Sequence, residues 1–195
     1  WNVGPYADSI PNLVFCAFQM MFAIITPALI TGAVVGRMRF KALFIFIALW
    51  SLVIYYPLAH MVWGQGGLLA ELGSVDFAGG DVVHISSGVT ALVLAIVLGR
   101  RKGYERMTYR IHNIPFVVLG ATILWFGWFG FNAGSALKAD GLAAHAFMTS
   151  AISSAAALLS WMFIDMVNDK KTTLVGASTG LVLGLVAITP GAGFV

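Results

Sequence analysis

The stretch SIPNLVFCAFQMMFAIITPALITGAVVG, from Ser9 to Gly36, contains no Asp, Glu, Lys, Arg or His. About 20 consecutive apolar residues are enough for a helix to cross the hydrocarbon core of a bilayer. A membrane-spanning β-strand is shorter and alternates apolar with polar residues, because its side chains face lipid and lumen in turn. The continuous apolar stretch therefore predicts a membrane-spanning helix.

Five more stretches of the same character follow along the chain. Hydrophobic residues make up 59% of the sequence and charged residues only 10%, against roughly 25% charged residues in an ordinary soluble domain. The fold class predicted is an all-α polytopic membrane protein. The predicted spans are residues 9–36, 42–63, 82–99, 113–137, 141–164 and 172–190.

The basic residues predict the topology. If alternate connections lie on the same side, one side holds every one of the 11 Lys and Arg residues except Lys138. The positive-inside rule places that side in the cytoplasm. The Trp1 end and the acidic connections are then outside, in a multi-pass protein of the plasma membrane, and the +3 net charge does not indicate binding to nucleic acid.

The remaining chemistry of the sequence is sparse. A single cysteine, Cys16, excludes an internal disulfide and is expected to be a buried small residue. The sequence shows no phosphate-binding loop, no metal-spaced cluster and no nucleophile beside a base, so we expect neither an enzyme nor a cofactor. The chain starts without Met and ends in apolar sequence, and both ends are expected to be cut.

Three motifs carry a family resemblance. They are FQMMFAIITPA at 18–28, DFAGGDVVHISSG at 76–88 and WFGWFGFNAGS at 125–135. Together they closely resemble the Amt branch of the ammonium transporter (Amt/Mep/Rh) family, and the likeness runs from Ile10 to Val195. The resemblance implies part of an eleven-helix fold that is built from two inverted five-helix halves and assembles as a homotrimer.

The chain resembles the third to eighth helices of that fold, so residues 1–195 are expected to form a single, partial transporter domain. In the family, the pore of each monomer is lined by two histidines. His84 matches the first histidine, whereas the second belongs to the tenth helix and lies outside these residues. A neutral imidazole offers one donor and one acceptor to a small amine, although a lone His84 could equally be satisfied by a carbonyl of the bundle.

The resemblance also implies roles for aromatic residues. Phe18, Trp63 and Ser135 match a site that recruits ammonium at the outer face, and Phe22 and Phe131 match the gate beneath it. Aromatic residues at helical spacing are more often packed in a core, and the tryptophan at the end of the second span could simply mark the membrane interface.

Four further polar or aromatic residues occur in the motifs. Asp76 is expected to cap the helix that follows it and so to support the outer site. Trp128 and Asn132 are expected to support the pore wall. Asp81 stands where the family pattern has a small or hydroxyl residue, and its role stays open.

The function expected is transport of ammonium or ammonia, with methylammonium as an analogue and a possible PII-type regulator on the cytoplasmic side. An ammonium sensor fused to a signalling module is the alternative. A haem-binding subunit that uses His60 and His84 as axial ligands is a weaker alternative. His60 and His145 match no motif and are expected at packing or interface positions.

Overall fold

The computed structural model describes residues 2–106 and 111–195. Contacts between residues divide the chain into two units, Trp1–Tyr109 and Arg110–Val195. The division falls between the third and fourth predicted spans, where the resemblance also places the boundary between the inverted halves. Trp1, which marks the end predicted to lie outside, and Arg110 of the basic connection lie outside the described residues.

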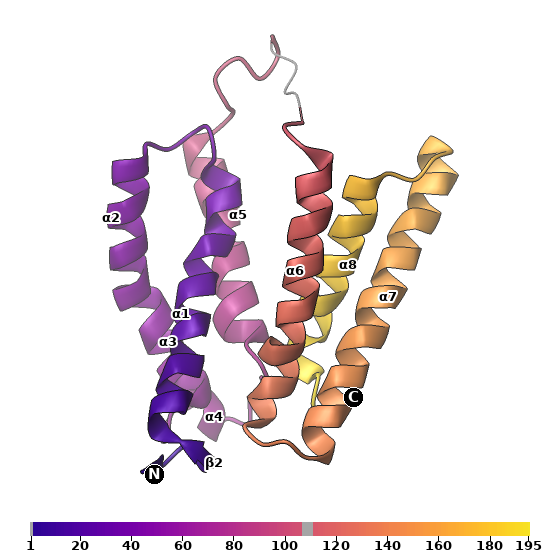
Figure 1. The fold of residues 1–195 in the computed structure, drawn as a ribbon. Helices are drawn as coiled ribbons and strands as arrows, with labels where there is room; N and C mark the ends of the chain where they lie inside the picture. Colours follow the sequence, from indigo (N-terminus) through magenta and orange to yellow (C-terminus); the bar gives the residue numbers. More distant parts are fainter. Residues whose placement is uncertain (1, 107–110) are drawn as a thin grey trace. The chain divides into compact units, whose positions relative to one another are not determined.

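The first unit starts with a short antiparallel hairpin and continues as helices (Figure 1). Its elements are the strands β1 (Val3–Gly4) and β2 (Ala7–Pro11), the helices α1 (Asn12–Val34), α2 (Phe40–Trp50), α3 (Tyr56–Trp63), α4 (Leu68–Glu71) and α5 (Ser86–Leu98), and the π-helical turns η1 (Ser51–Tyr55) and η2 (Gly80–Ile85). Helix α1 begins at Asn12 instead of Ser9, because Ala7–Pro11 pairs with Val3–Gly4.

Helix α1 packs along α5 and buries one face. The buried side chains recur at helical spacing and are Phe22, Thr26, Pro27, Ile30 and Val34. Cys16 lies on another face and is exposed, so the expectation that it is buried is wrong. In a membrane helix an apolar side chain can face lipid at no cost, and burial therefore does not follow from an apolar neighbourhood.

The second and third spans each contain a π-helical turn. Helix α2, η1 and α3 follow one another without a break from Phe40 to Trp63. The third span begins with η2 and continues as α5 to Leu98. A π-helical turn inserts one extra residue into a helix, and such turns are frequent at functional sites.

The charges of the first unit are separated between its two ends. Arg37 donates from Nη1 to the carbonyl oxygens of Ala95 and Gly99, at 3.3 and 2.8 Å, and so joins the end of α1 to the end of α5. Trp63 donates to the carbonyl oxygen of Asp76 at 2.9 Å at the opposite end. We call the end that carries Arg37, Arg100 and Arg101 the basic end, where Glu105 also lies beside Arg100, and the end that carries Asp76 and Asp81 the acidic end.

The second unit contains three long helices and two short 3₁₀ turns (Figure 1). They are α6 (Ile114–Asn132), η3 (Ala133–Ala136), α7 (Gly141–Asp169), α8 (Leu174–Ile188) and η4 (Thr189–Gly191). Each long helix starts at a side-chain cap: Asn113, Asp140 and Thr173 accept hydrogen bonds from backbone N–H groups of the first turn.

Helices α7 and α8 approach closely along a row of glycines on α8. A Cβ atom at Gly180 would lie 2.7 Å from the Cβ of Trp161 and 2.9 Å from the carbonyl oxygen of Ala157. Gly176 and Gly184 are equally crowded. Small residues at this spacing let the backbones of two membrane helices come together, where packing supplies the attraction that the hydrophobic effect cannot supply in lipid.

Six helices among the described residues are long and apolar enough to cross a membrane. They are Asn12–Val34, Phe40–Glu71, Gly80–Leu98, Ile114–Ala136, Gly141–Asp169 and Leu174–Gly191. The number agrees with the sequence prediction, and the chain is a multi-pass membrane protein.

Candidate functional site

Three aromatic rings meet at the acidic end of the first unit. The rings of Phe18 and Phe22 pack edge to face, with centroids 4.9 Å apart. Phe22 packs against Trp63 in the same way, at 5.7 Å. Phe22 thus lies between the other two rings, and only 3% of its surface is exposed. The contact is possible because Phe18 and Phe22 are four residues apart on α1 and so share a face.

Asp76 caps the start of the third span with both carboxylate oxygens. Oδ1 accepts from the backbone N–H groups of Gly79 and Gly80, at 2.7 and 2.6 Å. Oδ2 accepts from those of Asp81 and Val82, at 2.8 and 3.2 Å. These four donors belong to the loop and first turn of a helix, which have no partner within the helix itself. The predicted helix cap at Asp76 is confirmed.

The cap and the aromatic rings are joined through Trp63. Its indole N–H donates to the backbone carbonyl of Asp76. Gly79, with φ of 109°, adopts a left-handed conformation that favours glycine. A Cβ at this position would also lie 2.8 Å from Cγ2 of Val83 and 3.4 Å from the Trp63 ring. The glycine therefore lets the capping loop lie against the tryptophan.

His84 lies within the π-helical turn that Asp76 caps. Its backbone N–H donates to the carbonyl oxygen of Gly79 at 3.2 Å, the five-residue spacing that defines this turn. The side chain is half-buried, and the two preceding residues, Val82 and Val83, are completely buried. The extra residue in the turn sets which side of the helix carries the imidazole.

Asp81 belongs to the same turn but faces a different neighbour. Its Oδ2 accepts from the hydroxyl of Ser74 at 3.2 Å. Asp81 is thus a partly exposed residue of η2 whose side chain is hydrogen bonded to Ser74 of the preceding loop. This placement separates its role from that of Asp76.

A small cavity of about 170 Å³ adjoins the Trp63 ring in the first unit. Its lining includes His60 and five residues that the sequence reasoning did not select, namely Tyr6, Phe15, Gln19, Ala59 and Gly64. Tyr6 and Phe15 stack with centroids 5.6 Å apart. Tyr6 could not have been selected from sequence alone, because the hairpin brings it to α1.

In the second unit, Trp128 and Phe131 stack on each other at 4.7 Å. The hydroxyl of Ser135 donates to the carbonyl oxygen of Phe131 at 2.8 Å. A serine hydroxyl has one hydrogen and two lone pairs. Because this bond uses the hydrogen, the Ser135 oxygen is left as an acceptor.

Asn132 is buried in a polar network of the second unit. Its Nδ2 donates to Oγ of Ser150 at 2.9 Å, and its Oδ1 accepts from Oγ1 of Thr189 at 3.3 Å. Thr189 also accepts from the indole N–H of Trp128 at 3.2 Å. The network ties α6 to α7 and to the end of α8. Ser150 and Thr189 were missed by the sequence reasoning, because each is an ordinary hydroxyl residue in an apolar stretch.

The predicted site residues thus form two internally connected groups. Phe18, Phe22, Trp63 and Asp76 are linked in the first unit, which also carries His84. Phe131 and Ser135 are linked in the second unit, which also holds Trp128 and Asn132.

His60 and His145 lie apart from the motif residues in sequence and have neighbours of their own. The His60 ring lies over Gly64, and Nε2 of His145 hydrogen bonds to the carbonyl oxygen of Val195 at 2.6 Å. Among the described residues, no group of three or more His, Cys, Asp and Glu side chains could hold a metal ion.

These features define a class: a multi-pass helical membrane protein in which an aromatic cluster and a capped π-helical turn with a histidine lie at one end of the spans. Residues 2–195 match the profile of the Ammonium Transporter Family. The chain belongs to the ammonium transporter family. That family is one of transporters, in agreement with the prediction that the chain is not an enzyme.

Individual relatives give the same result. An ammonium transporter of Mycobacterium tuberculosis is 53% identical over 194 residues, which are 95% of this chain and 41% of that protein. The crystal structure of Saccharomyces cerevisiae Mep2 matches with a TM-score of 0.89 and 41% identity, over 97% of this chain and 43% of that chain. A structure described as "Sensor Amt Protein" matches with a TM-score of 0.84 and 34% identity, over 91% and 46%.

The chain spans about two fifths to half of the length of the curated relatives that it matches.

Proposed function

We propose that the complete protein carries ammonium, as ammonia, across the plasma membrane through a narrow pore in each monomer. The observation that carries the proposal is the contact of Phe18, Phe22 and Trp63 beside the turn that Asp76 caps. This turn bears His84, in a chain of the ammonium transporter family. Ammonium can then be captured, lose its water and pass the His84 imidazole in succession.

The family resemblance assigns capture to Phe18 and Trp63 of the first unit and to Ser135 of the second. An ammonium ion over an aromatic face gains roughly 0.5–2 kcal/mol, and more where water is excluded. The Ser135 hydroxyl donates to the Phe131 carbonyl and can therefore accept a hydrogen bond from the ion. A site without a carboxylate ligand binds the cation weakly enough for it to move on.

The gate and the pore exclude the charged ammonium ion and admit neutral ammonia. The family resemblance assigns the gate below the capture site to Phe22 and Phe131, and the near-complete burial of Phe22 within its own unit supports its part in this role. An unpaired charge is costly to bury in apolar surroundings, whereas neutral ammonia needs only hydrogen-bond partners. His84 supplies such a partner.

The proposal also covers the oligomeric state and the orientation of the complete protein. The complete protein is a homotrimer, with a second pore histidine contributed by sequence beyond residues 2–195. Asp76, Trp128 and Asn132 hold the walls of the site in place. The acidic end of the first unit faces outside, and the basic end faces the cytoplasm, where a PII-type regulator can dock.

Uptake of methylammonium tests the proposal. The complete protein is produced in transport-deficient cells with His84 intact or replaced, as His84→Leu. A matched control is His112→Leu, since His112 is exposed in the connection before α6. Expression and oligomeric state are measured for each variant.

We expect ammonium to compete with methylammonium for uptake. The rate of uptake should change strongly in His84→Leu and stay at the wild-type value in His112→Leu. Equal uptake by the two variants, with equal expression, would contradict a pore role for His84.

The second candidate function is an ammonium sensor. It is favoured by the match to the structure described as "Sensor Amt Protein". A sensor would use the same capture site to change a signalling module. A well-expressed, trimeric protein that binds methylammonium and does not take it up would support the sensor and overturn transport.

A further inference from the structure

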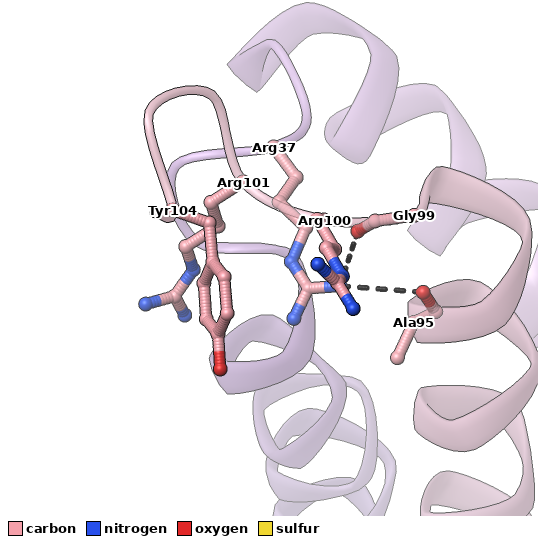
Figure 2. A pocket seen from close by; sticks show the side chains of 6 residues that line it. All are labelled: Arg37, Ala95, Gly99, Arg100, Arg101 and Tyr104. Atoms are coloured by element: carbon pink, nitrogen blue, oxygen red, sulfur yellow. Dashed lines mark hydrogen bonds between the residues drawn. The ribbon is translucent and has the colours of Figure 1, made fainter. Parts of the chain in front are cut away.

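A second cavity lies at the basic end of the first unit, far along the helices from the aromatic cluster. Its volume is about 520 Å³, and its lining combines three arginines with a tyrosine and two small residues. The lining is Arg37, Ala95, Gly99, Arg100, Arg101 and Tyr104. Figure 2 shows that the arginine side chains come from two connections, the one after α1 and the one after α5. Nothing in the proposed transport path uses this cavity.

Arg37 is held in place before any ligand arrives. Both of its bonds to the end of α5 are made by Nη1 (Figure 2). They place a positive charge against the last carbonyl groups of the helix, where the helix dipole is negative. A guanidinium that is already ordered loses less entropy when it binds a ligand, and the negative helix end no longer repels an anion.

Arg100 has a weak partner that a ligand can replace. It forms a salt bridge to Glu105 at 2.6 Å, but the two side chains are 74% and 75% exposed. Water and salt screen such a pair, so it contributes little. The guanidinium also lies 5.7 Å from the centroid of the Tyr104 ring. Arginine planes match the oxygens of a phosphate group and can bind them with two parallel hydrogen bonds.

The cavity lies at the ends of helices that are long and apolar enough to cross a membrane. Its lining comes from the last turn of α5, from the connection that follows Leu98 and from the connection that follows Val34 of α1. Large apolar side chains that are close in sequence to the lining are strongly exposed, with Phe40 at 80% and Val97 at 74%. Basic pockets between membrane helices at this level suit phospholipid headgroups.

We propose that this arginine cavity binds a phosphate group, presented by an anionic phospholipid or by a soluble phosphate compound. The phosphate is held by Arg100 and Arg101, next to the fixed charge of Arg37, and Glu105 gives up its salt bridge on binding. The proposed site is apart from the transport path, and its test does not depend on ammonium transport.

The test is a binding titration on the complete, detergent-purified protein. The probes are dioctanoyl phosphatidylglycerol, dioctanoyl phosphatidylcholine and inorganic phosphate, each followed by the shift in thermal unfolding. The pocket variant is the double substitution Arg100→Gln with Arg101→Gln. The control is Arg39→Gln with Arg106→Gln, which removes the same charge at exposed positions outside the cavity.

We expect phosphatidylglycerol to bind the wild type more tightly than phosphatidylcholine. Loss of one cation beside the phosphate weakens binding roughly five-fold, so the pocket variant should bind about 25-fold more weakly. Water and salt screen the exposed arginines outside the cavity, so the control should stay within about three-fold. Glu105→Gln removes the carboxylate that competes with the phosphate for Arg100, so this variant should bind more tightly. It provides a second test if the arginine variant folds poorly.

Binding of phosphatidylglycerol that inorganic phosphate does not displace identifies a lipid headgroup as the ligand. Binding of inorganic phosphate with the same dependence on Arg100 and Arg101 identifies a soluble phosphate compound. Equal weakening in the pocket and control variants, or no binding of either probe, overturns the proposal.

Discussion

The substitution Asp76→Asn should destabilise the protein far more than the same change at the other acidic residues near helix starts. Asp76 is 8% exposed and accepts four backbone hydrogen bonds, between 2.6 and 3.2 Å. Asparagine has the same shape but only one oxygen. It can still accept from Gly79 and Gly80, whereas its amide nitrogen faces the N–H groups of Asp81 and Val82 and cannot accept from them.

The expected size follows from the two lost bonds. A hydrogen bond to a charged group contributes about 1.5–3 kcal/mol, and replacing a helix cap typically costs about 0.5–2 kcal/mol. The energy of two bonds to a nearly buried carboxylate should exceed the range for a single exposed cap. We therefore expect a loss of about 3 kcal/mol in the free energy of unfolding.

Two matched substitutions define the baseline. Asp140 is exposed, and its Oδ1 accepts both capping bonds of α7, from Leu142 and Ala143. Asparagine caps a helix about as well as aspartate, so Asp140→Asn should be nearly neutral. Asp81→Asn affects one bond to Ser74 at the protein surface and should change stability by no more than about 0.5 kcal/mol.

The assay is unfolding of the complete protein in mixed micelles of detergent and SDS, with the three variants measured beside the wild type. A loss at Asp76 no larger than the loss at Asp140 would refute the reasoning. The four bonds would then contribute no more than an exposed cap does.

Two further predictions use the same protein. Gly180→Ala should separate α7 from α8 and cost about 1–3 kcal/mol of stability, because a Cβ there meets Trp161. Gly120→Ala, where a Cβ would have nothing within 4 Å, should be neutral or gain up to about 1 kcal/mol. The same unfolding assay measures both variants, and equal effects would contradict close packing of α7 and α8. Trp63→Phe keeps an aromatic ring but loses the bond to the Asp76 carbonyl. The same assay should therefore show a loss of about 1 kcal/mol in the free energy of unfolding, and an unchanged free energy would contradict the role of that bond.

Several features could be predicted from residues alone because they depend on neighbours in the sequence. A long apolar stretch has to form a helix in lipid, since each backbone polar group needs a partner within the segment. The stretch from Ser9 to Gly36 therefore located the first span without knowledge of the fold. Asp76 was predictable as a cap because its partners, Gly79 to Val82, follow directly in the chain.

Other features lay beyond the sequence because their partners are distant. Trp63 could be an interface residue or a site residue, and only the bond to Asp76 and the contact with Phe22 connect it to the capped turn. Asn132 matched a motif, but its partners Ser150 and Thr189 come from other helices. The burial expected of Cys16 was wrong, because an apolar neighbourhood does not distinguish lipid from protein.

By itself, the sequence determined that the chain crosses a membrane as helices, where the third span is capped, and which motifs link it to ammonium transporters. The tertiary structure decided how the spans meet. It placed Phe22 between Phe18 and Trp63, brought the glycine row of α8 against α7, and gathered Arg37, Arg100 and Arg101 around one cavity. The physical reason is that lipid satisfies every apolar helix face equally well, so hydrophobicity sets the spans, whereas close packing and buried hydrogen bonds between distant residues set their arrangement.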